Sequence, residues 1–112
     1  ARMDSIVLRL KDISRKYNIP IVVISSFNRQ NYGQQANMTA FKESGSIEYS
    51  SDVVIALEFS ALSEDEKSYD EVQERSKAIR NVDVVVLKNR NGQSGARIHY
   101  AFYTKYNYYY EK

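Results

Sequence analysis

Two basic residues near the end of the chain have a spacing that suits phosphate binding. Lys88 and Arg90 are two residues apart, so both side chains project to the same side of an extended segment. Asn91 and Gly92 follow directly, and this dipeptide predicts a tight hairpin that would hold both cations at its tip. A planar guanidinium suits a phosphoryl group that gains negative charge better than an ammonium does. The alternative is a pair of solvated charges beside a turn.

A second basic residue lies near a glycine, which suggests contact with a polyanion. Lys42 supplies positive charge, and Gly45, three residues later, lets the backbone approach a phosphate closely, with Glu43 between them. Contacts of this kind position a nucleic acid without reading its sequence. The same residues also fit an ordinary helix N-terminus, and the two interpretations remain open.

Helices and strands must position these residues. Apolar residues recur every three or four positions over Met3–Tyr17, which predicts a helix. The apolar run Ile21–Ile24 predicts a strand buried on both faces of a parallel sheet, and it ends at Ser25 and Ser26. A helix followed by such a strand is the second half of a βαβ unit, whose first strand would precede Ala1.

The remaining patterns complete an α/β fold with a mostly parallel sheet, flanking helices and an antiparallel hairpin at one edge. A polar loop is expected first, at the carboxyl end of a strand, where α/β proteins bind ligands. The expected segments are the loop over Phe27–Ala40, a short helix over Phe41–Ser51, a strand over Val53–Leu57, an acidic helix with a capping box from Ser63 to Glu66 and an end near Arg80, and strands over Val82–Lys88, Ala96–Tyr103 and Tyr106–Tyr110.

Composition excludes several classes of protein and site. The 112 residues make one domain or part of one. Without cysteine there is no disulfide or thiolate zinc site, and one histidine cannot build a multi-histidine site, so no metal site is expected. The apolar runs Ile19–Ile24 and Val53–Leu57 are too short to span a membrane. Charged residues interrupt the N-terminus where a signal peptide would be apolar, so we expect a cytoplasmic protein.

Charge and aromatic residues are unevenly distributed. The formal net charge is +2, but residues 58–77 hold seven acidic and three basic residues, which leaves the rest of the chain mildly basic. A basic surface is compatible with a polyanionic partner and is also common in soluble proteins. Seven of the 14 aromatic residues lie between Tyr100 and Tyr110, where Tyr100 and Phe102 share a strand face and are expected to pack in the core. His99 would lie on the opposite face, partly exposed.

Three stretches, in this order, resemble the C-terminal RecA-like ATPase domain of DnaB-type replicative DNA helicases. They are Asn18–Arg29 (NIPIVVISSFNR), Phe41–Val54 (FKESGSIEYSSDVV) and Lys88–Gly95 (KNRNGQSG). The resemblance covers nearly the whole chain apart from the acidic segment, so residues 1–112 are interpreted as the C-terminal portion of such a domain. It covers only the second half of the domain, because the chain contains neither a P-loop motif nor the carboxylate that holds magnesium.

The resemblance implies a role for each candidate residue. It implies that Lys88 and Arg90 act in trans, as an arginine finger and its companion, on the nucleotide of the adjacent subunit. It further implies that a loop with Lys42, Glu43 and Gly45 faces a central channel and grips single-stranded DNA. The family usually has Arg where this chain has Lys42, so the charge is kept but bidentate geometry is lost.

One position departs from the family pattern in a way that affects coupling. The family usually has a glutamine at Ser26, where it senses the γ-phosphate and couples hydrolysis to the grip on DNA. Either Ser25 and Ser26 sense the nucleotide more weakly, or the coupling residue is absent. Arg29 is a further candidate for nucleotide or subunit contact, with an ordinary surface arginine as the alternative.

The resemblance implies a parent protein that forms a hexameric ring on single-stranded DNA and unwinds duplex DNA with ATP and Mg²⁺. Primase or a helicase loader would be further partners, and no membrane is expected. The 112 residues alone are expected not to hydrolyse ATP, since they lack the P-loop. The alternatives are a RecA-family recombinase or clock-type ATPase, and a non-catalytic RecA-like module that binds single-stranded DNA or a helicase partner. Ser26 favours the module slightly, whereas Lys88 and Arg90 argue against it.

Overall fold

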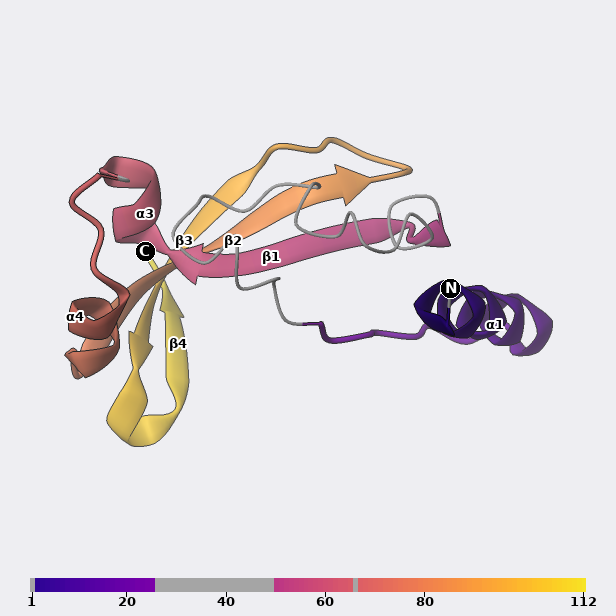
Figure 1. The fold of residues 1–112 in the computed structure, drawn as a ribbon, viewed down its shortest axis with the longest axis horizontal. Coiled ribbons are helices and arrows are strands. Elements are labelled where there is room, and N and C mark those ends of the chain that lie inside the picture. Colours follow the sequence, from indigo (N-terminus) through magenta and orange to yellow (C-terminus); the bar gives the residue numbers. More distant parts are fainter. Residues whose placement is uncertain (1, 26–49, 66) are drawn as a thin grey trace.

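The computed structural model describes residues 2–25, 50–65 and 67–112. Helix α1 (Arg2–Tyr17) comes first, and four strands form the sheet later in the chain (Figure 1). The further elements are β1 (Val53–Phe59), α3 (Ser60–Glu64), α4 (Glu71–Ser76), β2 (Ile79–Asn89), β3 (Arg97–Tyr103), a 3-10 turn (Thr104–Tyr106) and β4 (Tyr108–Glu111). The predicted helix at the N-terminus and the three strands after residue 78 are confirmed, with small shifts of their ends.

The described strands form an antiparallel sheet. Their order is β1-β2-β3-β4, and each strand pairs antiparallel with the next. The expected parallel sheet is therefore not present among the described residues. The short connections from β2 to β3 and from β3 to β4 allow only antiparallel pairing, because a parallel pair needs a long crossover, and the helices α3 and α4 connect β1 to β2.

The expected strand over Ile21–Ile24 is not formed. No described strand pairs with it, and its side chains are exposed, Val22 by 89% and Ile24 by 94%. β-Branched residues fit a half-buried pleated surface, so their preference for strands is realised only where neighbours cover them. The prediction of a buried strand here is wrong for the described chain.

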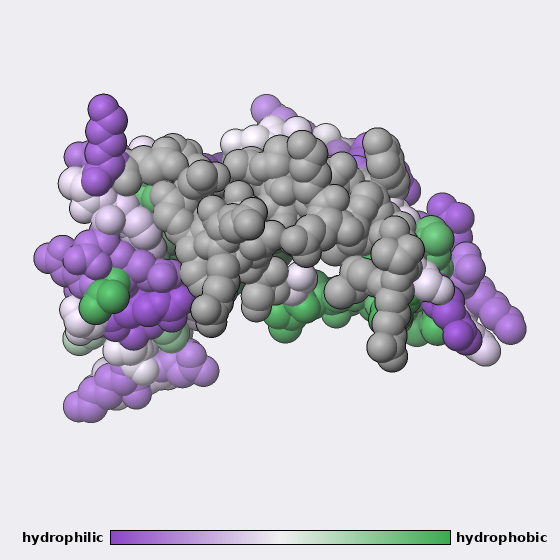
Figure 2. Space-filling model, in the orientation of Figure 1, coloured by the Kyte–Doolittle hydropathy of each residue, from purple (hydrophilic) through white to green (hydrophobic). Residues whose placement is uncertain are grey.

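Strand β1 is buried on one face only. Val54, Ala56 and Glu58 are buried, whereas the alternate residues Val53, Ile55 and Leu57 are exposed by 55–59%. The expectation of a strand buried on both faces is therefore wrong, because the described residues cover only one face of β1. Figure 2 shows hydrophobic residues on the surface in the middle of the molecule, between hydrophilic ends.

The acidic segment forms two short helices rather than one. Ser63 lies inside α3, and its Oγ donates to the carbonyl oxygen of Ser60 at 3.0 Å, so the predicted capping box is wrong. Asp70 caps α4 instead, and its carboxylate accepts from the backbone N–H groups of the second and third helical residues. Strand β2 already begins at Ile79, before the expected end of the acidic helix.

A bulge interrupts the pairing of β1 with β2 beside the hairpin. Ile55 lies opposite Val86, but Val54 lies opposite Lys88, so Leu87 is an extra residue in β2. A β-bulge of this kind bends the strand and increases its local twist. The bulge places Lys88 across from the buried Val54.

Aromatic rings join β3 to β4. The ring of Phe102 stacks on that of Tyr109 with centroids 4.4 Å apart, and Tyr100 meets Tyr109 edge-on at 6.4 Å. Tyr100 and Phe102 therefore share a strand face, as predicted, but both are half-buried rather than packed in the core. Asn107 takes the left-handed conformation at φ 51°, which Asn tolerates well, and it ends the 3-10 turn before β4.

Candidate functional site

The hairpin between β2 and β3 carries both predicted cations. Lys88 is half-buried near the end of β2, and Arg90 is exposed at the start of the turn. A Cβ atom at Gly92 would lie 2.6 Å from Nδ2 of Asn89, so a larger residue there would require the Asn89 side chain to move. The predicted hairpin between β2 and β3 is confirmed, but its connection covers residues 90–96 rather than a tight turn, and Lys88 lies within β2 rather than at the tip.

Arg90 is bound to Asp52 by two hydrogen bonds. Its backbone N–H donates to the carbonyl oxygen of Asp52 at 2.8 Å, and Nη1 of its guanidinium donates to Oδ1 of the same residue at 2.7 Å. From helix α1, Nζ of Lys11 lies 2.8 Å from each of the two carboxylate oxygens. Lys11, Asp52 and Arg90 together form what we call the hairpin-root cluster.

The hairpin-root cluster keeps its carboxylate ionised in a basic setting. The hydrogen bond from Lys11 is the main cause that holds the pKa of Asp52 below its ordinary value. Burial is the next largest effect and raises the pKa, whereas the positive charges of Lys11, Arg90 and Arg15 each lower it further. A hollow of about 180 Å³ lies beside the cluster, lined by Leu8, Lys11, Asp12, Arg15, Ser50 and Arg90.

This arrangement suits contact with an oxyanion. A guanidinium has five N–H donors in a rigid fork, so Arg90 can keep its bond to a carboxylate while another donor meets a phosphate oxygen. The Arg90 side chain is 38% exposed, which gives such an anion access. Lys88 lies two residues earlier, in β2, and adds a second positive charge to the hairpin.

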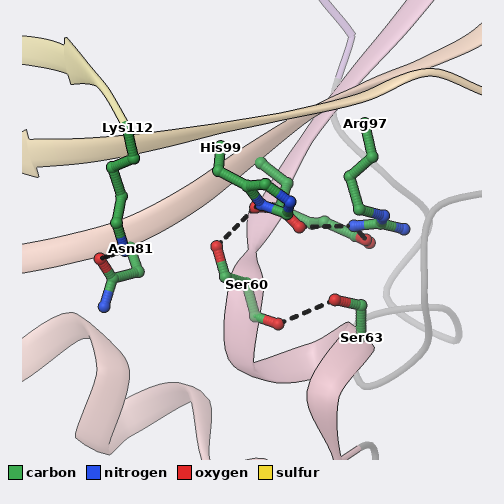
Figure 3. Close-up of polar contacts among 8 residues, drawn as sticks. Ser60, Ser63, Asn81, Arg97, His99 and Lys112 are labelled. Atoms are coloured by element: carbon green, nitrogen blue, oxygen red, sulfur yellow. Dashed lines mark hydrogen bonds and ion pairs between the residues drawn. The ribbon is translucent and has the colours of Figure 1, made fainter.

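A second polar cluster lies on one face of the sheet. Asp83 is fully buried, and its carboxylate accepts from Oγ of Ser60 at 2.5 Å and from Nη1 of Arg97 at 2.7 Å, while Nδ1 of His99 lies 2.7 Å away (Figure 3). Arg97 also donates to Oε1 of Glu58 at 2.6 Å. These five residues are named the Asp83 cluster. Cross-strand pairing places Glu58, Asp83 and His99 in one row over three strands.

The hydrogen bonds of the Asp83 cluster outweigh the effect of burial. Burial raises the pKa of Asp83, but the hydrogen bonds from Ser60, Arg97 and His99 bring that pKa below its ordinary value. Likewise, burial lowers the pKa of Arg97, and its bonds to Asp83 and Glu58 reverse this. An ionised carboxylate only accepts, so Nδ1 of His99 carries the proton that it shares with Asp83. The prediction that His99 is a partly exposed strand residue is confirmed.

The structure places only some of the predicted site residues. It brings Lys88 and Arg90 together on the hairpin, and Ser25 is exposed at the end of the first described segment. The residues outside the described parts of the chain are Ser26, Arg29, Lys42, Glu43 and Gly45. Their predicted roles remain predictions.

Sequence reasoning missed the residues that surround Arg90. Asp52 is 38 positions from Arg90 in the chain, and no local pattern connects the two. The positions of Lys11 and Arg15 did hold a signal, because residues four apart lie on one face of a helix. Neither a cluster of three or more potential metal-ligating side chains nor a helix able to span a membrane occurs within the described residues.

Comparison with known proteins connects these features to one family. The family model described as "DnaB-like helicase C terminal domain" matches residues 1–111. The "Replicative DNA helicase DnaC" of Bacillus subtilis (strain 168) is 30% identical over 108 residues, which are 94% of this chain and 22% of that protein. The "Probable replicative DNA helicase" of Trieres chinensis is 26% identical over 96 residues, 83% of this chain and 20% of that protein.

The extent of these matches defines what they establish. No solved structure matches the chain significantly. The chain spans about a fifth of the length of the two curated relatives. The family match, however, runs through α1, the sheet, the hairpin-root cluster and the Asp83 cluster. The chain therefore belongs to the family of DnaB-like helicase C-terminal domains, as the KNRNGQSG hairpin and the two other stretches predicted.

Proposed function

We propose that this chain is part of an ATP-driven replicative helicase that unwinds duplex DNA as a hexameric ring on single-stranded DNA. In this proposal Arg90 is the arginine finger, which reaches the nucleotide of the adjacent subunit, and Lys88 assists it. The names of both relatives support a helicase as the parent protein.

The observation that carries the proposal is the setting of Arg90. Its guanidinium is exposed, yet its backbone N–H and Nη1 both bind Asp52, at 2.8 Å and 2.7 Å. A group that stabilises charge in a transition state works best when it is fixed before the reaction, because then it needs no reorganisation. An exposed guanidinium that is fixed at the start of the hairpin turn has these properties.

ATP and Mg²⁺ fit the parent protein rather than this chain alone. The exposed Arg90 and the nearby Lys88 suit the anionic end of a nucleoside triphosphate, but the 112 residues contain no P-loop. Bound ATP would supply the phosphoryl group for transfer to water. Arg90 would donate N–H groups to its oxygens as negative charge develops on them.

The same proposal gives the segment outside the described residues a role in binding DNA. Lys42 and the backbone at Gly45, with Glu43 between them, would contact phosphates of single-stranded DNA. Ser25 and Ser26 would stand where nucleotide is sensed. We also propose a cytoplasmic location and a primase or helicase loader as partner.

The test is Arg90→Ala in the full-length parent protein, with ATP hydrolysis and ATP binding measured separately. We expect kcat to fall about 10³- to 10⁵-fold, as for the loss of other arginine fingers, with little change in the Kd for ATP. Arg75→Ala is the matched control, because Arg75 is an exposed arginine of α4 that pairs with Glu71. An equal loss of ATP binding would instead give Arg90 a structural role.

Two further measurements address the alternatives. In rings of mixed subunits, Arg90→Ala subunits should silence the sites of their wild-type neighbours, since the finger acts in trans. Assays of duplex unwinding and of strand exchange separate a helicase from a recombinase. Absence of ATP hydrolysis in the wild-type parent would favour a non-catalytic module.

A further inference from the structure

Asp52 holds Arg90 at two levels, backbone and side chain. Its carbonyl oxygen accepts the N–H of Arg90, which fixes the start of the turn against the start of β1. Its Oδ1 accepts Nη1 of the guanidinium, which fixes where the side chain points. A single residue therefore determines the position of the main chain of Arg90 and also the orientation of its charge.

Lys11 in turn orients Asp52. Its Nζ bridges both carboxylate oxygens at 2.8 Å, and its side chain is only 18% exposed, so helix α1 holds the carboxylate from the other side. A carboxylate bound by one flexible partner can rotate, whereas one bound by two groups on different elements is restricted. The carboxylate of Asp52 thus connects α1 to the hairpin.

We propose that Asp52 is a positioning residue for the arginine finger and that Lys11 supports it from α1. The inference rests on the proposed function of Arg90 and adds two residues to which no role had been given. Asp52 would touch neither nucleotide nor DNA. Its effect on hydrolysis would pass through the orientation of the Arg90 guanidinium.

A purely structural ion pair is the alternative, and exposure argues against it. The Asp52 side chain is 56% exposed, and ion pairs between exposed groups contribute little to stability. Loss of the carboxylate should therefore change the fold little, since the backbone hydrogen bond does not need the side chain. Orientation of a catalytic group is far more sensitive, because a displacement of about 1 Å can lower a rate about 10²-fold.

The experiment compares Asp52→Ala and Asp52→Asn in the full-length parent protein. We expect Asp52→Ala to lower kcat by about 10²-fold, while the Kd for ATP and the denaturation midpoint stay unchanged. Asn keeps an acceptor oxygen, so Asp52→Asn should recover part of the loss. Lys11→Met should lower kcat less than Asp52→Ala does. The matched control is Glu64→Gln, which removes one exposed negative charge from α3.

Combination with Arg90→Ala separates this inference from the proposed function. If Asp52 acts through Arg90, adding Asp52→Ala to Arg90→Ala lowers kcat no further. A further drop in the double variant, or full activity of Asp52→Ala, would overturn the positioning role and leave the finger intact. If Asp52→Ala lowers the denaturation midpoint as well as kcat, Asp52 has a structural role. Full activity of Arg90→Ala itself would instead overturn the proposed function.

Discussion

The hairpin-root cluster and the Asp83 cluster use the same chemistry in opposite settings. In each, one carboxylate binds two basic side chains. Lys11 of α1 and Arg90 of the hairpin bind Asp52, and Arg97 and His99, both of β3, bind Asp83. The carboxylate of Asp52 is 56% exposed and that of Asp83 is fully buried.

The difference in exposure separates two uses of an ion pair. In water the attraction between charges is weak and salt screens it, so an exposed pair can orient a side chain without locking it away from a ligand. A buried carboxylate has lost its hydration and must keep every partner, so the Asp83 cluster determines how three strands fit together. We therefore expect defects of activity from the first cluster and defects of stability from the second.

The largest effect on stability is expected for Asp83→Ala. This change leaves the half-buried guanidinium of Arg97 without one of its two carboxylates, and breaking a buried ion pair typically costs about 3–5 kcal/mol. Chemical denaturation of the full-length protein measures the loss. Asp52→Ala in the same assay should leave the midpoint unchanged. If both variants unfold equally easily, the distinction between the clusters fails.

A milder variant keeps this comparison measurable when Asp83→Ala does not accumulate as folded protein. Ser60 and Arg97 bind different oxygens of Asp83, and Asp83→Asn keeps an acceptor oxygen for only one of them, so this variant should lie between the wild type and Asp83→Ala in stability. If Asp83→Asn and Asp83→Ala are each as stable as the wild type, burial of this carboxylate has no structural consequence.

The pH dependence of stability should sharpen the comparison. The pKa of Asp83 is lowered in the folded state, so the unfolded chain binds more protons at acidic pH. Its contribution is fully present above the unfolded carboxyl value of about 4 and is lost as pH falls through the lower folded pKa. The free energy of unfolding should therefore decrease as pH falls below about 4, and Asp83→Asn should flatten this decrease.

Salt distinguishes the two carboxylates in that pH titration. The pKa of Asp52 is also lowered, chiefly by Lys11, but at 1 M salt the screening length is about 3 Å and exposed pairs lose most of their attraction. In the wild type, the share of the stability loss at acidic pH that depends on Asp83 should persist at high salt. This share is the difference between the wild type and Asp83→Asn. Its disappearance would mean that the Asp83 cluster is open to solvent.

The smallest expected effect is on DNA binding and concerns Lys42, which lies outside the described residues. If Lys42 neutralises one phosphate of single-stranded DNA, Lys42→Ala should reduce the salt slope of DNA binding by about 1. Binding of fluorescent oligonucleotides by the full-length protein at several salt concentrations measures this slope. An unchanged slope would remove Lys42 from the DNA interface. Lys67→Ala in the acidic segment is the control.

Sequence patterns predicted those elements whose structure depends mainly on residues close together in the chain. Helix α1 has its own apolar face, and the Asn91-Gly92 turn joins β2 to β3. The run Ile21–Ile24 has equally clear β-branched composition, yet it pairs with no described strand. Strand formation depends on a neighbour, which composition does not reveal. The capping box failed for a local reason, because Ser63 lies within α3 and the following helix α4 begins after its own cap, Asp70.

The candidate site was predictable in part for the same physical reasons. The two-residue spacing of Lys88 and Arg90 beside a hairpin signal identified the cations. Asp52 could not be assigned to them, since its contact with Arg90 arises only when β1 pairs with β2. Buried Asp83 was missed because an isolated carboxylate in an apolar strand gives no sign of its partners on β3.

The extra residue Leu87 shifts by one position the alternation of side chains between the two faces of β2. Side chains on a strand change face at every residue, so one inserted residue exchanges the faces of all those that follow. Here the shift brings Lys88 opposite Val54, whereas uninterrupted counting from Val86 opposite Ile55 would pair Val54 with Leu87. The direction in which the hairpin carries its charge is therefore encoded in the length of β2 as well as in its residue types, and a gain or loss of one residue there would invert it.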